Sequence, residues 1–141
     1  MARYYRLDEA NERLAELRPM LEKLRDDRNA VAELQQKIRD IRSNNGSADH
    51  AAEIGRIEDE MRSIVTQMKD AVDQVDEWGV ALRDIGTGLI DFPALANGRP
   101  IWLCWRLGET DEINWWHEAN KGFDSRQPLS ELDMGAEGGR A

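Results

Sequence analysis

Apolar residues recur every three or four positions through the first half of the chain. This spacing predicts two amphipathic helices. The first apolar stripe consists of Leu14, Leu17, Leu21, Leu24, Val31, Leu34, Ile38 and Ile41. The second consists of Ile54, Ile57, Met61, Ile64, Met68, Ala71, Val75, Trp78 and Leu82. Its regular 3-4 alternation is typical of a coiled-coil seam. The polar stretch SNNGSAD separates the stripes, so we expect an antiparallel helical hairpin over about residues 8–79.

The ends of these helices carry recognisable signals. Asp8 is predicted to be the N-cap of the first helix, with Glu9 in its first turn, where a carboxylate suits the helix dipole. Pro19 removes one helix hydrogen bond, so we expect a bend or the start of a second segment there. In SNNGSAD, Asn and Gly can end a helix in the left-handed conformation, and Ser47 or Asp49 can cap the next helix.

The pattern changes after Gly79, where glycine and proline interrupt the chain and helical period is lost. LIDFPAL reads as an extended segment, and Asn97-Gly98 is a turn signal. PIWLCWRL, residues 100–107, is apolar on both alternating faces, which predicts a central, covered strand. INWWHE, residues 113–118, can pair back across the polar turn GETDE. The expected sheet region covers about residues 86–129.

The predicted fold class is therefore α+β: a long antiparallel helical hairpin followed by a small Trp-rich antiparallel sheet. The chain of 141 residues is long enough for one domain, which we place at residues 1–129. The tail over residues 130–141, which ends in GAEGGRA, is expected to be disordered.

Charge and composition exclude several classes of protein. The formal net charge is −9, and a negative field repels nucleic acid and anionic membranes. One cysteine cannot form an internal disulfide, and no CxxC motif or Cys/His cluster gives zinc spacing. MARYYRLDEAN lacks the apolar core of a secretory signal, and no apolar run is long enough to span a bilayer. We expect a cytoplasmic protein.

Several motifs occur in a specific order: LDEAN, LRPML, GLIDFPAL, WLCWRLGE, WWHE and GFDSRQPL. Together they resemble the uncharacterised bacterial family catalogued as domain of unknown function 2203, over residues 4–129. The resemblance implies a helical hairpin with a small C-terminal sheet region. It implies no activity and no catalytic residues.

Residues 102–129 hold four of the five tryptophans, the only cysteine and one of the two histidines. A tryptophan-lined cleft with basic side chains would suit an anionic or aromatic ligand. The ligand-binding candidates are Arg106, His117, Glu118, Arg126, Trp102 and Trp115. The alternative is that the tryptophans cover both faces of the sheet and build a core that two helices lack.

His117 and Glu118 are the candidate metal ligands, although neighbours on a strand point to opposite faces. The alternative role for His117 is a buried hydrogen bond that fixes the sheet. Cys104 would need His117 within hydrogen-bond reach to act as a nucleophile, and otherwise is inert packing. His50 is a weak partner for His117. Arg126 could bind an anion or pair with Glu118 or Asp124.

Two functions follow from these patterns. The first is a non-enzymatic interaction or assembly protein, which forms a homodimer because pairing two hairpins buries more apolar area than one hairpin alone. Binding to a different protein is also compatible with these patterns. The second is a metal- or small-ligand-binding protein with its site in the C-terminal segment, a reading that also allows an enzyme. No cofactor is required by the sequence, and a metal is compatible with it.

Overall fold

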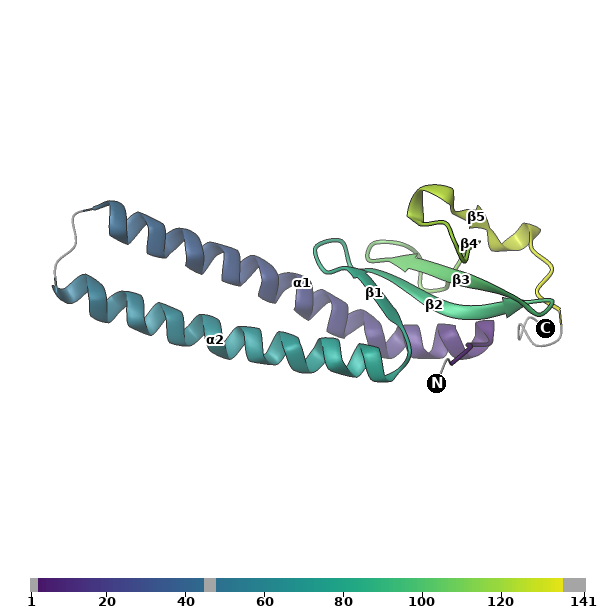
Figure 1. Ribbon diagram of the computed structural model, residues 1–141, viewed down its shortest axis with the longest axis horizontal. Coiled ribbons are helices and arrows are strands. Elements are labelled where there is room, and N and C mark those ends of the chain that lie inside the picture. Colours follow the sequence, from purple (N-terminus) through teal and green to yellow (C-terminus); the bar gives the residue numbers. More distant parts are fainter. Residues whose placement is uncertain (1–2, 45–47, 136–141) are drawn as a thin grey trace.

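The computed structural model describes residues 3–44 and 48–135. Two long helices come first, α1 (Leu7–Ser43) and α2 (Ala48–Glu77). Five strands follow: β1 (Ala81–Asp84), β2 (Leu89–Ala96), β3 (Arg99–Arg106), β4 (Trp115–Glu118) and β5 (Gln127–Pro128). Figure 1 shows the helices side by side as a hairpin, with the sheet packed on one end of it. The predicted α+β architecture is confirmed.

Helix α1 begins earlier than predicted and is not divided. Arg6 is the N-cap, so the assignment of Asp8 to this position was wrong. The backbone N–H of Arg6 donates to Oε1 of Glu9 at 2.9 Å, which satisfies one of the N–H groups at the helix start. The helix runs through Pro19 without a break, so no second segment starts there. Asn44 is the C-cap, and Asp49 lies inside α2, so it is not the N-cap of that helix. The caps predicted at residues 45–47 lie outside the described residues.

The sheet is an antiparallel meander with strand order β1-β2-β3-β4-β5. Strand β1 was missed, because Leu82 was assigned to the apolar stripe of the second helix. Leu82 instead pairs with Ile90 of β2. The two longest pairings, β2 with β3 and β3 with β4, follow the sequence patterns, including the return of β4 onto β3 across GETDE.

The two faces of the sheet have different surroundings. The inner face packs against α1, where every second residue of β2 and β3 is buried. This core joins Ile90, Phe92, Ala94, Ile101, Leu103, Trp105 and Trp116 from the sheet to Leu14, Leu17, Leu21 and Leu24 from α1. The outer face carries Asp91, Trp102, Cys104, Trp115 and His117, as the register and strand alternation require.

The segment after residue 129 is more ordered than expected. A short 3-10 helix covers Leu129–Glu131, and the side chain of Met134 is buried. The backbone N–H of Asn97 donates to the carbonyl oxygen of Met134 at 3.0 Å. Burial of one large apolar side chain therefore holds this part of the predicted tail against the β2–β3 turn. Residues 136–141 lie outside the described residues.

Neither α1 nor α2 is apolar enough over sufficient length to cross a membrane, within the part of the chain that the structure describes.

Candidate functional site

Three polar side chains from neighbouring strands meet on the outer face of the sheet. Asp91 of β2 is paired in register with Cys104 of β3, which is paired in turn with Trp115 of β4. His117 lies two residues beyond Trp115 and so points to the same face. One donor atom from each of Asp91, Cys104 and His117 lies within 4.8 Å of the other two. All three residues are at most 3% exposed, so we call them the buried polar cluster.

Both ring nitrogens of His117 have partners. Nδ1 lies 3.0 Å from the backbone carbonyl oxygen of Glu118, and Nε2 lies 3.0 Å from Oδ2 of Asp91. A carbonyl oxygen can only accept, so Nδ1 carries the hydrogen of that bond. The Nε2 atom is thereby directed into the cluster, and one proton joins it to the Asp91 carboxylate.

Among the described residues, hydrogen bonds reach only one of the two carboxylate oxygens of Asp91. Its Oδ2 accepts hydrogen bonds from Nε of Arg83, at 2.9 Å, and from His117. Its Oδ1 is buried and has no hydrogen-bond partner among the described residues. A buried carboxylate oxygen without a partner is costly and is therefore rare in folded proteins.

Cys104 is held as a thiol. Burial, as the largest cause, and the negative charge of Asp91 together raise the pKa of its side chain to about 12. The nearby Arg126 acts in the opposite direction on this pKa but is outweighed. A thiol with such a pKa is a poor nucleophile at neutral pH. Since both nitrogens of His117 bond to other groups, the arrangement is not a Cys-His nucleophile pair.

A second ion pair covers the cluster near Cys104. Arg126 donates from Nη1 and Nη2 to the two carboxylate oxygens of Glu109, at 3.1 and 2.7 Å. The same Nη1 lies 3.9 Å from Sγ of Cys104. The guanidinium carbon of Arg126 is 4.9 Å from the ring centre of Trp115 and 4.1 Å from that of Phe123. This stacked, bidentate pair fixes the segment that precedes β5 over the sheet.

The structure separates the candidates that the sequence grouped together. His117 is in the cluster, whereas the Glu118 side chain pairs with Arg99, so these two do not form a joint metal site. Arg126 pairs with Glu109, not with Glu118 or Asp124. Arg106 stacks on Phe123, with 4.7 Å between the guanidinium carbon and the ring centre.

The tryptophans also divide between the two faces. Trp102 and Trp115 lie on the outer face beside the cluster, and Trp102 is stacked by Arg83 at 4.8 Å. Trp105 and Trp116 are buried in the core under α1. His50, in α2, belongs to the hairpin and not to the sheet.

Two functional candidates were missed from the sequence: Asp91 and Arg83. Asp91 did carry a signal, because it is the single acid inside the apolar strand sequence LIDFPALA. A lone carboxylate in such a strand needs a buried partner. Arg83 carried no comparable signal, since it is one of many charged residues in polar sequence.

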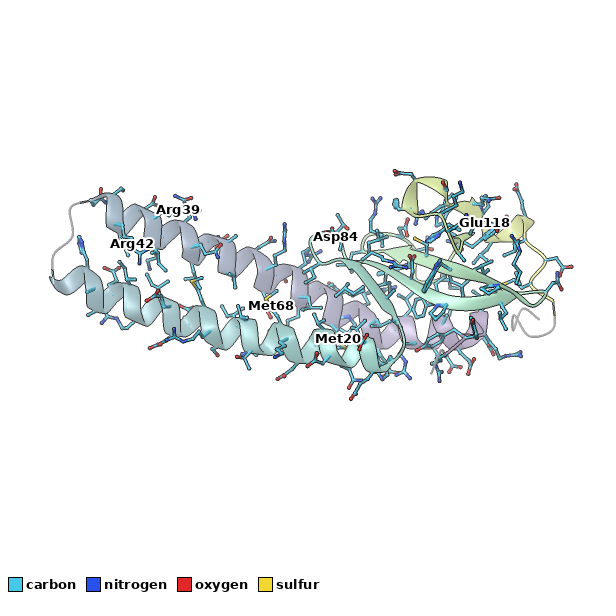
Figure 2. All side chains as sticks on the ribbon, viewed as in Figure 1. Met20, Arg39, Arg42, Met68, Asp84 and Glu118 are labelled. Atoms are coloured by element: carbon cyan, nitrogen blue, oxygen red, sulfur yellow. The ribbon has the colours of Figure 1, made fainter. Side chains whose placement is uncertain are left out.

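The hairpin offers a second candidate site, away from the sheet. Past Leu24, α1 buries only Ile38 among its described residues. Between the helices lies a hollow of about 640 Å³, and a second hollow of about 430 Å³ adjoins it at Val65. We call the two together the hairpin groove; its apolar lining is Val31, Ala32, Ile38, Met61, Val65, Met68 and Val72. Figure 2 places Met68 on the stretch of hairpin that projects from the sheet.

Comparison with known proteins gives one family. The model of the family described as "Uncharacterized conserved protein (DUF2203)" matches residues 3–129. No curated protein and no solved structure matches the chain. The matched range includes α1, α2, the whole sheet and every residue of the buried polar cluster. The chain therefore belongs to the DUF2203 family.

Proposed function

We propose that this chain is a non-enzymatic assembly protein, and that the hairpin groove pairs it with a second copy of itself. The observation that carries the proposal is the exposure of Val65. This residue lines both hollows of the groove and is 50% exposed. A large apolar side chain at the junction of two apolar hollows is typical of an interaction surface.

The apolar pattern of the helices supports the same conclusion. The stripe of α1 continues beyond the sheet through Val31, Leu34, Ile38 and Ile41, although the sheet covers only its first part. Two helices alone bury a narrow seam, and Val31, Leu34 and Ile41 stay half-buried. A second hairpin laid on the groove would complete a four-helix arrangement and remove this apolar surface from water.

Sedimentation equilibrium and native mass spectrometry at micromolar concentration test the proposal. We expect a dimer for the wild-type chain. Val65→Asp places a charge in the groove and should give a monomer with unchanged helix content. Ser63→Asp, on an exposed position of α2 outside the groove lining, is the matched control and should remain dimeric. A monomeric wild type, or a dimer unaffected by Val65→Asp, contradicts the proposal.

A further inference from the structure

We propose that the buried polar cluster is a binding site for a divalent transition metal ion, with zinc as the expected ion. The Asp91 carboxylate, the Cys104 thiolate and Nε2 of His117 are the protein ligands. Oxygen, sulfur and imidazole nitrogen are the donor types that zinc takes in proteins. They come from three adjacent strands, and their donor atoms lie within 4.8 Å of one another.

The hydrogen bonding of His117 is the arrangement that a metal ligand requires. Histidine ligands usually donate the second ring N–H to a carbonyl or carboxylate, which fixes the tautomer and the ring plane. Here Nδ1 donates to the carbonyl oxygen of Glu118, and Nε2 faces Asp91 and Cys104. The ring is already oriented so that its free electron pair would point at the ion once the shared proton leaves.

The unpartnered oxygen of Asp91 is an independent observation that points to a ligand. Asp91 is 3% exposed, and its Oδ1 has no hydrogen-bond partner among the described residues. The other oxygen is held by Arg83, which would support the carboxylate from outside the coordination sphere. A bound cation would satisfy Oδ1 and remove the cost of leaving it buried and unpaired.

The charges around the cluster balance once the ion is present. A thiolate and a carboxylate together neutralise a divalent ion, and His117 binds as the neutral imidazole. Arg126 has its own counter-ion in Glu109, and its Nη1 lies near Sγ of Cys104, where it can donate to a metal-bound thiolate. Three protein ligands leave one coordination position, which a water molecule would take.

The ion needs a path into the cluster. Arg83 is the most accessible of the covering side chains, with 45% of its side chain exposed, and it lies against Trp102. A swing of this one arginine would uncover the Asp91 carboxylate without any change in the strands. Arg126, at 12% side-chain exposure, is held by Glu109 and would stay in place.

Cobalt(II) in place of zinc tests the site in the full chain, since its absorption reports on the ligands. We expect one cobalt ion per chain, a near-ultraviolet thiolate-to-cobalt band, and displacement of cobalt by zinc. Cys104→Ser should abolish that band. Loss of a residue that only supports a metal ligand weakens metal binding by roughly 10- to 100-fold. Asp91→Asn and His117→Gln remove ligands themselves, so each should weaken cobalt binding by more than this.

The matched control is Glu112→Gln, which changes an exposed carboxylate in the turn between β3 and β4, outside the cluster. It should bind cobalt as the wild type does. His50→Gln removes the other histidine and should also have no effect. Circular dichroism checks that each variant is folded; if Asp91→Asn or His117→Gln unfolds, the wild-type and Cys104→Ser spectra decide alone. Binding without a thiolate band, a band retained in Cys104→Ser, or no binding to the wild type overturns the proposal.

Discussion

The imidazole of His117 is joined to the carboxylate of Asp91 by a buried hydrogen bond of 3.0 Å that crosses the central strand β3. The two side chains are 1% and 5% exposed. This bond links β2 to β4, which are not neighbours in the sheet. It therefore fixes the outer face of the meander in a way that backbone pairing alone does not.

The Asp91–His117 pair should behave as a unit in unfolding experiments. In chelator-treated protein, His117→Leu removes one partner of the buried Asp91 carboxylate and leaves Arg83 as the other, so we expect a loss of about 1–3 kcal/mol in the free energy of unfolding. The double variant Asp91→Leu/His117→Leu also removes the buried carboxylate and should be more stable than the single variant. Urea denaturation measures both, and additive losses would contradict the coupling.

The thiol of Cys104 should make stability fall at alkaline pH. Its pKa is about 12 in the folded chain, against an ordinary value of 9.0. Above pH 9 the unfolded chain loses this proton while the folded chain keeps it, so deprotonation favours unfolding. Below pH 9 the thiol does not change how the free energy of unfolding varies with pH. Between pH 9 and 12 it lowers that free energy by up to about 1.4 kcal/mol per pH unit.

Comparison with Cys104→Ala isolates this contribution, because tyrosines and lysines titrate alike in both proteins. The difference in free energy of unfolding between wild type and variant should be constant up to pH 9 in the absence of metal, and should then shift against the wild type. Parallel curves through alkaline pH would show that the thiol is not protected in the folded state.

The Arg126–Glu109 pair should depend on its planar, two-bond geometry. Arg126→Lys keeps the charge but loses the bidentate contact and the stacking on Trp115 and Phe123. We expect a loss of about 1.5–3 kcal/mol in the free energy of unfolding. Arg99→Lys changes a more exposed pair, with Glu118, and should cost less than about 1 kcal/mol. Equal losses in the two variants would contradict a special role for Arg126.

Two glycines should respond in opposite directions to alanine. Gly88 has φ of +67°, and a Cβ there would lie 2.4 Å from the side chain of Leu107, so Gly88→Ala should destabilise the chain by at least about 1–3 kcal/mol. Gly55 lies within α2 with open space around its Cβ position, so Gly55→Ala should stabilise it by about 0.5–1 kcal/mol. Thermal melting measures both shifts, and a shift of the same sign in both would contradict the local geometry.

The sequence predicted most of the fold because its patterns are local. A three-four period predicts a helix, and alternating apolar residues between turn signals predict a strand, so α1, α2, β2, β3 and β4 were all expected. Strand β1 was missed because Leu82 continues the helical period by chance. The order of Met134 was missed because a single apolar residue in a polar tail carries no period.

The candidate site was harder to predict because it depends on register. His117 and Cys104 were recognised by residue type, but whether they share a face follows only from how β3 and β4 pair. Asp91 comes from a third strand, and its place opposite Cys104 is a property of the β2–β3 pairing. Glu118 was chosen for its chemistry beside His117, yet only its backbone carbonyl contacts the imidazole.

The length of α1 has a mechanical consequence. Its 37 residues span about 55 Å, at 1.5 Å per residue, and the last core residue under the sheet is Leu24. The hairpin therefore extends as a stiff spacer for roughly 28 Å beyond that point. A group bound near the far end of the hairpin would therefore lie at a fixed distance from the sheet. In an assembly of two chains paired through their hairpins, the length of the hairpin would determine the distance between the two sheets.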